Sequence, residues 1–423
     1  MPTFPSIPNP IPLPRRSAHE YRYRDPGAAQ YPSAHLGALA LQSVGKAAGG
    51  TSDGARPQWR DLDLRRRGRW DRAEWLIHDW AAVNATLRDG DIGFGRSYRE
   101  GSWDSPDVTS LIRLALRNRH LLEQCIQGHW ARRGLYWLAD RLLRRNSRTG
   151  SRRNIAQHYD LGNDFYRLWL DPSMTYSSAY YGNQREQSLE SAQQAKYQAA
   201  LEALQLQPGA TILEIGCGWG GFAEHAARRG YRVRGLTLSR EQRQYAEERI
   251  AQRGLAELAS FHYQDYRDEV GHYDGIVSIE MFEAVGQEWW STYFGQIRQL
   301  LRPGGRALIQ TISIRDDRFE RYAGGSDFIR RYVFPGGFLP SPARFSQSLV
   351  AAGLQVLGRL DFGLDYATTL QHWRESFDRE TKALGELGFD AAFRRLWRFY
   401  LSYCEAGFAE RELDVGQWTL CHA

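Results

Sequence analysis

Residues 211–222 read TILEIGCGWGGF, and this stretch decides the fold. It begins in an apolar, β-branched run over residues 210–215 that predicts a buried strand. A glycine-rich turn follows, and residues 222–229 predict a helix. Strand, glycine turn and helix in this order are typical of a nucleotide site, because glycine permits close backbone approach and the helix N-terminus offers free N–H donors. The glycines are Gly216, Gly218, Gly220 and Gly221.

The glycine spacing fits two kinds of cofactor site. The first, second and fourth glycines match the G-x-G-x-x-G of dinucleotide sites, whereas the first three match the G-x-G-x-G of S-adenosylmethionine (SAM) methyltransferases. Glu214 lies two residues before the first glycine, where methyltransferases commonly carry an acid. The next predicted strand, 231–238, lacks the acid that an NAD site places about 20 residues on. SAM is therefore favoured over NAD, and a purely structural glycine turn ranks third.

Composition and charge bound the class of protein. The chain has 423 residues, 42% apolar and 13% aromatic, so it is globular and long enough for two or three domains. The net charge is +6, and the arginine-rich first third suits an anionic partner, although scattered solvated charge is the commoner cause. We expect a membrane surface and no nucleic acid. No apolar run approaches the roughly 18 residues of a membrane helix, and no signal peptide is expected. The cysteines lack paired or metal-ligand spacing, which predicts reduced thiols, no metal and a cytoplasmic location.

Four segments are predicted along the chain. Residues 1–56 are rich in Pro, Gly, Ser and Ala and are expected to be a disordered tail. Residues 57–127 are expected to form a small lipid-associated N-terminal domain, in which Asp107 caps a helix. Residues 128–150 predict a basic helix with tryptophan, which suits a membrane interface and a packed linker equally. Residues 151–423 are expected to form the methyltransferase domain.

Alternating strands and helices in this last segment predict an α/β fold, a doubly wound, mostly parallel Rossmann-like sheet. Residues 157–181 are expected to form a lid over the cofactor, and residues 330–341 a loop. Ser239 and Gln242 form a capping box at the start of a helix. Ligands bind at the carboxyl ends of parallel strands, so polar side chains at those ends are expected to share one site. These side chains are Thr237, Asp265, Glu280 and Glu283.

Eight motifs carry a resemblance to a known family: HYDLGNDFY, MTYSSAYY, LEIGCGWGG, GLTLSREQ, QDYRD, SIEMFEAVG, YVFPGGFLPS and DYATTL. In this order they resemble the cyclopropane fatty acid synthase family, which includes the mycolic acid cyclopropane synthases and methyltransferases. The resemblance runs over residues 89–418. It implies a SAM-dependent methyltransferase that acts on the double bond of an unsaturated acyl chain, usually in a membrane phospholipid, with peripheral association to the membrane.

The resemblance also implies roles for particular residues. Tyr159 would lie near the transferred methyl group. The residues expected to bind SAM, with Glu214 and Gly220 added from the glycine motif, are Tyr176, Ser177, Glu214, Gly216, Gly218, Gly220, Thr237, Gln242, Asp265 and Tyr266. Aromatic residues of the last helices are candidates to line an acyl cavity, with ordinary core packing as the alternative for most: Phe377, Phe389, Phe393, Trp397, Tyr400, Tyr403 and Phe408.

The base that closes a cyclopropane in this family is usually a bound bicarbonate, held by a Cys, a Glu, a His and a Tyr. The chain keeps Glu283 and Tyr366, but Ser178 replaces the Cys and Gln310 replaces the His. Serine and glutamine still hydrogen-bond an anion, so bicarbonate is weakened but kept as an alternative. Glu280 stands where many synthases have glycine. We hypothesise that its carboxylate replaces bicarbonate, and that its proximity to Glu283 raises one pKa so that one group is an acid and the other a base.

The sequence alone leaves open the reaction product and the class of protein. A cyclopropane is expected ahead of a methyl- or methylene-branched chain. A small-molecule N-methyltransferase and a catalytically silent lipid-binding protein are the alternatives, and a homodimer is left open.

Overall fold

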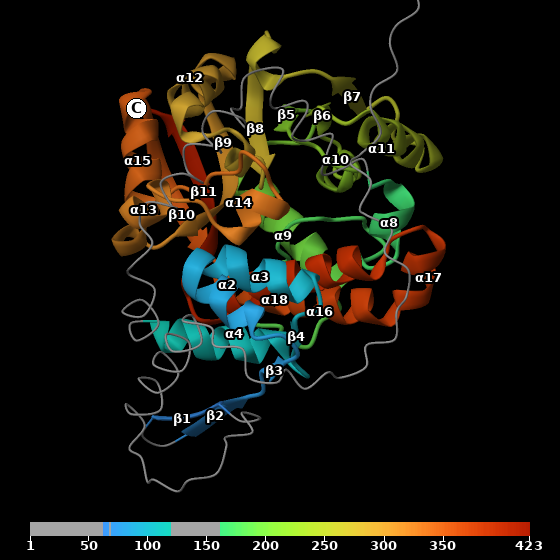
Figure 1. The fold of residues 1–423 in the computed structure, drawn as a ribbon. Helices are drawn as coiled ribbons and strands as arrows, with labels where there is room; N and C mark the ends of the chain where they lie inside the picture. The colour runs from blue at the N-terminus through green and yellow to red at the C-terminus, as the bar shows by residue number, and fades with distance from the viewer. Residues whose placement is uncertain (1–61, 67–68, 120–160) are drawn as a thin grey trace, which may run out of the picture.

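The computed structural model describes residues 62–66, 69–119 and 161–423 (Figure 1). A seven-stranded sheet lies at its centre, with strand order β10-β11-β9-β8-β5-β6-β7. Strands β5 to β9 pair in parallel, whereas β11 is antiparallel to both β9 and β10. The predicted fold class, a mostly parallel α/β sheet, is confirmed. The strands are β5 (Thr211–Ile215), β6 (Arg232–Thr237), β7 (Ala259–Tyr263), β8 (Tyr273–Ile279), β9 (Leu301–Ile314), β10 (Leu354–Asp361) and β11 (Leu413–His422).

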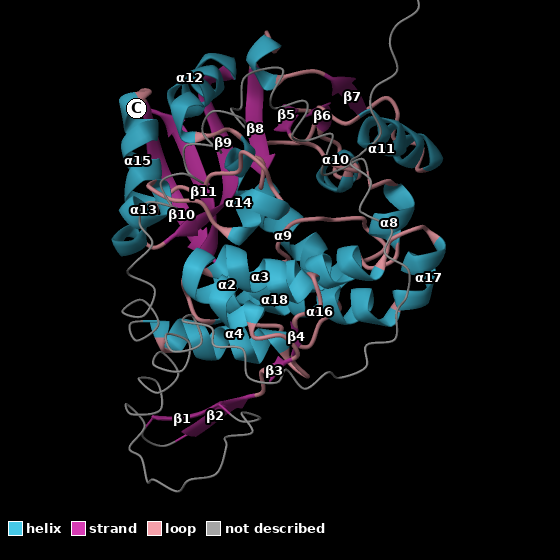
Figure 2. Cartoon of the chain, viewed as in Figure 1, coloured by secondary structure: helices cyan, strands magenta, loops and turns pink. Residues whose placement is uncertain are grey.

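Helices cover both faces of the sheet (Figure 2). On one face α9 (Leu189–Leu204), α10 (Gly221–Ala227) and α11 (Arg240–Gln252) pack on side chains such as Ile212 and Val277. On the other face α12 (Trp290–Leu300), α13 (Asp316–Ala323) and α15 (Pro342–Ala351) pack on Leu213 and Ile309. Adjacent residues Ile212 and Leu213 thus point to opposite faces, as the pleat of a strand requires.

A layer of helices lies beyond the carboxyl ends of the parallel strands, below the sheet in Figure 1. Residues of its long helices α16 and α18 share one apolar core with α4. The division of the chain into domains stays a prediction. The structure shows that α4, from the expected N-terminal domain, packs in one core with α16 and α18 of the expected methyltransferase domain. The remaining described helices are α2 (Ala81–Asp89), α3 (Asp91–Arg99), α4 (Val108–Arg117), α8 (Asn163–Arg167), α14 (Phe328–Tyr332), α16 (Gly363–Arg379), α17 (Thr381–Glu386) and α18 (Ala391–Ala409). Two small antiparallel sheets precede the central one: β1 (Leu62–Arg66) pairs with β2 (Arg69–Ala73), and β3 (Leu76–Ile77) pairs with β4 (Trp103–Asp104).

Local signals in the sequence are largely confirmed. Asp107 accepts a hydrogen bond from the Ser110 amide at the start of α4, and Ser239 does the same for Gln242 at the start of α11. Part of the predicted loop 330–341 is wrong, because α14 extends to Tyr332. Strand β9 begins at Leu301, earlier than predicted, and residues 302–305 interrupt its register with β8.

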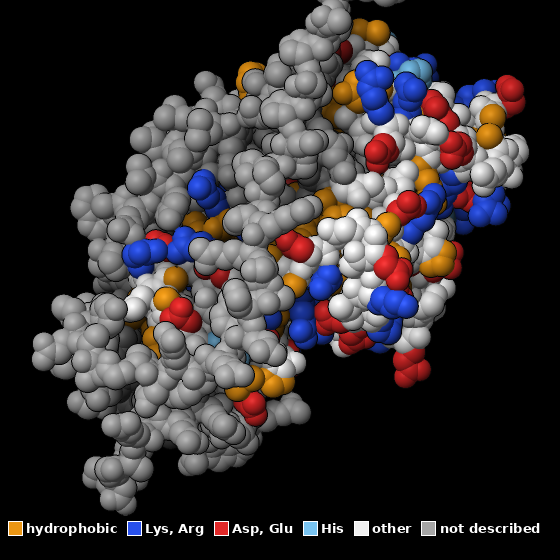
Figure 3. Space-filling model, turned by 45° about the vertical axis from the view of Figure 1, so that its right-hand side comes forward, with side chains coloured by type: hydrophobic (Ala, Val, Ile, Leu, Met, Phe, Trp, Pro, Cys, Tyr) orange, Lys and Arg blue, Asp and Glu red, His pale blue; other side chains and the backbone are white. Residues whose placement is uncertain are grey.

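Three predictions lie outside the described residues: the tail 1–56, the helix 128–150 and Tyr159. Within the described ranges, no helix is both long and apolar enough to cross a membrane. On the face drawn in Figure 3, basic and acidic side chains of the described residues are interspersed rather than gathered by sign.

Candidate active site

The glycine turn after β5 adopts the conformation that its residues predict. Gly216, Gly218 and Gly220 all have positive φ angles, of 83°, 50° and 80°, which side chains other than glycine rarely adopt. A Cβ atom on Gly216 would lie 2.9 Å from Cβ of Met281, whereas one on Gly218 would face open space. The turn therefore leaves room for a ligand above Gly218, while Gly220 forms the N-cap of α10.

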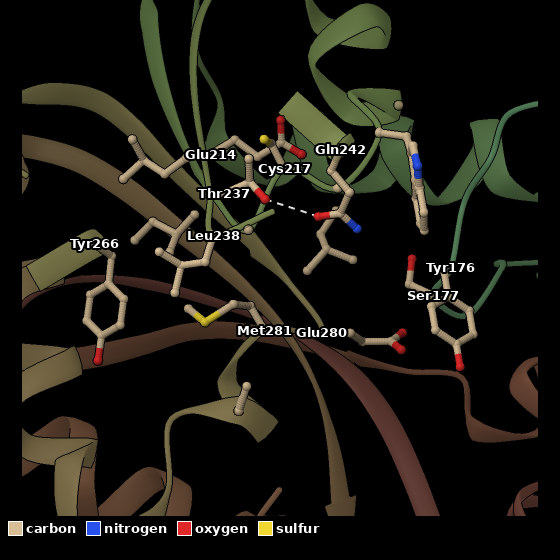
Figure 4. A pocket seen from close by; sticks show the side chains of 18 of the residues that line it. Tyr176, Ser177, Glu214, Cys217, Thr237, Leu238, Gln242, Tyr266, Glu280 and Met281 are labelled. Atoms are coloured by element: carbon tan, nitrogen blue, oxygen red, sulfur yellow. Dashed lines mark hydrogen bonds between the residues drawn. The ribbon is translucent and has the colours of Figure 1, made fainter. Parts of the chain in front are cut away.

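A pocket opens over this turn (Figure 4). It is lined by nine of the ten residues predicted to bind SAM; Gly220, behind the turn, is the exception. The nine come from β5, β6, the 174–177 segment, the start of α11 and the loop after β7, which are separate in the sequence. Their convergence follows from the parallel sheet, which brings the carboxyl ends of neighbouring strands to one edge.

Glu214 gives this pocket its electrostatic character. Its side chain is buried, and its Oε2 atom has no hydrogen-bond partner among the described residues. Desolvation raises the pKa of this carboxyl to about 8, against the opposing charges of Lys196 and Arg249. An unsatisfied buried carboxylate oxygen fits the ammonium group of a methionine moiety, because a charged partner would repay its desolvation.

Gln242 supplies a second polar group to the pocket. Thr237 Oγ1 donates to Gln242 Oε1 over 3.0 Å, the dashed line in Figure 4. The amide oxygen is thereby occupied, and the Nε2 donors of Gln242 remain for a ligand. The backbone N–H of the same residue is held by the Ser239 cap, so Gln242 serves both the helix and the pocket. Nearby, Asp265 forms a bidentate ion pair with Arg267 at 2.9 and 2.6 Å.

The most distinctive feature of the site is the side chain of Glu280, at the end of β8. Its Oε1 atom accepts hydrogen bonds from the backbone N–H of Ser178 and from Gln310 Nε2, both at 2.8 Å. Its Oε2 atom accepts one from Tyr366 Oη at 2.7 Å. Desolvation raises the pKa of Glu280, and the Tyr366 hydrogen bond is the largest effect that lowers it. The carboxylate is thus fixed among three donors while lining the cofactor pocket.

The backbone of Glu280 is strained. Its φ angle is 51°, in the left-handed region that glycine adopts freely and a glutamate does not. Such strain costs on the order of 1 kcal/mol or more and persists where surrounding contacts fix the residue. Here the three hydrogen bonds to the carboxylate offset it. A side chain at position 280 thus costs conformational energy that glycine would avoid, and such strained residues are typical of functional sites.

Glu283 lies in a different environment from the one that the resemblance implies. Its Oε1 atom accepts from the backbone N–H of Ile312 at 2.6 Å and from Thr311 Oγ1 at 3.0 Å. Its Oε2 atom is buried without a partner among the described residues. Desolvation, and then the negative charge of Glu280, raise its pKa to about 8. Burial thus raises the pKa of both carboxyls, and the division into one acid and one base stays a prediction.

The structure thus brings Ser178, Glu280, Gln310 and Tyr366 into direct contact, with Glu283 close by. Ser178 contributes its backbone, since its hydroxyl donates to the carbonyl of Ala179 over 2.9 Å. The catalytic roles of these residues stay predictions. Four of the rings proposed to line an acyl cavity form a chain of contacts, Phe389–Phe393–Trp397–Tyr400, in which Phe393 and Trp397 stack with centroids 5.6 Å apart. The lining of an acyl cavity stays a prediction.

Sequence reasoning missed two polar residues of this centre. Gln417, on β11, donates to Gln310 Oε1 over 3.1 Å and orients the amide that faces Glu280. Lys196, on α9, is fully buried and donates to Ser177 Oγ over 2.6 Å. The sequence did contain a signal for Lys196: it lies at helical spacing with the apolar residues Ala192, Ala200 and Leu204, which share the buried face of α9.

The family assignment rests on a match over the whole site. The model of the mycolic acid cyclopropane synthetase family matches residues 146–418, well over half of the chain. The chain belongs to this family. It is accordingly a SAM-dependent methyltransferase of the cyclopropane synthase type, as predicted.

Individual members of the family are also similar to this chain in sequence or in structure. The chain is 39% identical to the tuberculostearic acid methyltransferase UfaA1 of Mycobacterium tuberculosis, over 79% of each chain. It is 35% identical to the cyclopropane-fatty-acyl-phospholipid synthase of Escherichia coli, over 78% of this chain and 83% of that one. The solved mycolic acid cyclopropane synthase CmaA1, in complex with SAH and CTAB, superposes with a TM-score of 0.59 at 32% identity, covering 64% of this chain and 97% of CmaA1.

Proposed function

We propose that this protein methylates the double bond of an unsaturated acyl chain in membrane phospholipid, and that Glu280 is the internal base of the reaction. The observation that carries the proposal is the carboxylate of Glu280, held by Ser178, Gln310 and Tyr366 at the edge of the cofactor pocket. Such a substrate places the protein at the membrane surface, on the cytoplasmic side.

When bound, SAM supplies an electrophilic methyl group whose transfer to an alkene leaves a carbocation on the acyl chain. Glu214, Ser177, Thr237 and Gln242 are the polar residues suited to hold the cofactor. An alkene is a weak nucleophile, so the residues of the site must hold it in line and exclude water from the cation.

Glu280 is suited to the step that follows. An ionised carboxylate stabilises a nearby cation and accepts the proton that the cation must lose. Loss of a proton from the added carbon closes a cyclopropane, and loss from a neighbouring chain carbon leaves a branched, unsaturated chain. In either case one proton passes from the substrate to a Glu280 oxygen, and the electron pair of the broken C–H bond neutralises the cation.

Three observations support Glu280 in the place of bicarbonate. The donors that surround its carboxylate belong to three of the positions that the family resemblance assigns to a bicarbonate site: Ser178, Gln310 and Tyr366. All three residues are nearly or fully buried, so they provide a dry environment. A fixed carboxylate among these donors leaves their hydrogen bonds satisfied without a second anion.

The experiment uses purified full-length protein, SAM labelled in its methyl group, and three acceptors: vesicles of unsaturated phospholipid, vesicles of saturated phospholipid, and free amines. We expect label in the acyl chains of the unsaturated vesicles alone, because only these contain an alkene. Mass spectrometry of the released acyl chains then distinguishes ring from branch. Label in the amines would overturn the proposal in favour of an N-methyltransferase, and transfer to no acceptor would also contradict it.

A further inference from the structure

Lys196 is a charged residue without access to solvent. Its exposed fraction is 0%, and it lies in the middle of α9 on the face that packs against the sheet. Lysines are almost never fully buried unless they are paired, because transfer of an ammonium group out of water is costly. A buried lysine next to a cofactor pocket therefore requires a specific explanation.

The ammonium group of Lys196 is held by groups of the pocket wall. It donates to Ser177 Oγ over 2.6 Å and lies 4.5 Å from the ring centroid of Tyr197. Desolvation lowers the pKa of Lys196 to about 7, and the negative charge of Glu280 is the largest effect in the opposite direction, followed by Asp171 and Glu214. Lys196 is thus the cation opposite two of the site's carboxylates.

Three side chains of α9 form hydrogen bonds to residues 175–177, the segment of the pocket wall that contains Ser177. Besides the bond from Lys196, Gln193 Nε2 donates to the carbonyl of Ser177 over 3.0 Å. Tyr197 Oη is hydrogen-bonded to Thr175 Oγ1 at 2.9 Å. Residues 193 and 196 are three apart on a helix and therefore lie on one face, so they fix both the backbone and the hydroxyl of Ser177.

This arrangement determines where the Ser177 proton points. The Ser177 oxygen accepts from Lys196, and a hydroxyl has one proton to donate. No acceptor for that proton occurs among the described residues, and Ser177 lines the cofactor pocket (Figure 4). The hydroxyl proton is therefore available to an anionic group of the ligand, and SAM carries one such group, the carboxylate of its methionine moiety.

We propose that Lys196 is a positioning residue for SAM: it orients the Ser177 hydroxyl toward the cofactor carboxylate. The inference rests on SAM as the cofactor and is independent of the acyl substrate. The hydrogen bond from Lys196 also polarises the Ser177 hydroxyl, because chains of hydrogen bonds strengthen one another in a low-dielectric interior.

The test is a double-mutant cycle on SAM binding, measured by calorimetry at neutral pH in the absence of lipid. The variants are Lys196→Met, Ser177→Ala and the double variant of the full chain. Lys382→Met is the matched control, because the side chain of Lys382 is 91% exposed. We expect Lys196→Met to raise the SAM dissociation constant about 10- to 100-fold, the range for a hydrogen bond to a charged group. In the Ser177→Ala background the same change should have an effect of about twofold or less, because the two residues act as a unit.

Thermal unfolding of the free variants separates positioning from a merely structural role. Removing one partner of a buried charged pair is destabilising, so we expect Lys196→Met to melt below the wild type. SAM binding is therefore measured well below the melting temperature of each variant, where a weaker affinity of the folded variant reports positioning. Lys196→Gln, which stays polar, provides a second cycle. A SAM dissociation constant within twofold of the wild type in both Lys196 variants would overturn the inference, as would full additivity with Ser177→Ala. Because lipid is absent, neither result depends on the proposed acyl substrate.

Discussion

Nε2 of Gln310 donates to Oε1 of Glu280 over 2.8 Å, and both residues depart from the usual pattern of the family. The contact joins the two departures in one hydrogen bond. The side-chain amide of Gln310 is a neutral donor that suits a carboxylate oxygen. Glu280 itself supplies the negative charge, which in a site with histidine would come from a bound anion. The two residues thus form one unit, and changing one alone removes a buried hydrogen-bond partner from the other.

Glu280→Gln tests the base directly. The variant keeps the shape of the side chain but cannot accept a proton, so we expect the turnover number to fall by about 10²- to 10⁴-fold, the usual contribution of a general base. SAM affinity should fall much less than turnover, because Glu280 lines the pocket but the residues suited to hold the cofactor are other side chains. Glu320→Gln, on the exposed face of α13, is the control. Wild-type turnover in Glu280→Gln would contradict the role.

Tyr366→Phe tests the hydrogen bond to the other oxygen of Glu280. Tyr366 Oη donates at 2.7 Å and lowers the pKa of that carboxyl. Without this bond the pKa of Glu280 rises, so a higher pH is needed to ionise the base. We expect the acid limb of the pH–rate profile to move to higher pH, with neutral turnover reduced by about 10- to 100-fold, as for loss of a bond to a charged group. An unshifted profile would disagree with this prediction.

Glu283→Gln tests the raised pKa of the buried Glu283 carboxyl through the pH dependence of the melting temperature. The pKa of Glu283 is about 8 in the folded protein, against an ordinary value of 4.5, so the folded state binds the extra proton between these values. The free energy of unfolding of the wild type therefore falls as pH rises through this window. The variant lacks this titration, so its melting temperature should decline less steeply. Part of the decline remains, because Glu214 shifts in the same direction. Parallel melting curves from acid to pH 8 would contradict the assignment.

Gln417→Leu tests the orientation of Gln310. Gln417 faces Gln310 across β11 and β9, and its Nε2 donates to Oε1 of Gln310 over 3.1 Å. Without that donor the amide of Gln310 is free to rotate and present its oxygen to Glu280. We expect turnover to fall by about 3- to 30-fold, the effect of roughly one hydrogen bond, with SAM affinity unchanged. Gln355→Leu, on exposed β10, is the control; equal activity of the two variants would count against the role of Gln417.

The parts of the site that sequence could predict share a physical cause. Gly216 and Gly218 follow β5, Thr237 ends β6, and Asp265 and Glu280 follow β7 and β8, so a parallel sheet brings them to one edge. The capping role of Ser239 depends on residues three apart and was equally predictable.

The missed elements depend on contacts between distant residues. Strand β11 was not predicted, because it inserts between β9 and β10 from the end of the chain and contains Gly416 and Gln417, which weaken a strand signal. Gln417 looks like a surface residue in the sequence, and Lys196 is marked there only by its place on the apolar stripe of α9. The left-handed backbone of Glu280 is likewise set by tertiary contacts rather than by its neighbours.

The most direct measurement of the central claim is the dependence of turnover on bicarbonate. Wild-type protein, SAM and unsaturated phospholipid vesicles are assayed in buffer freed of carbon dioxide, then with bicarbonate added, beside a family member with Cys, His and Gly at the positions of Ser178, Gln310 and Glu280. With Glu280 as the base, turnover of this protein is the same in both buffers. Turnover that falls when bicarbonate is removed and returns when it is added would contradict the claim.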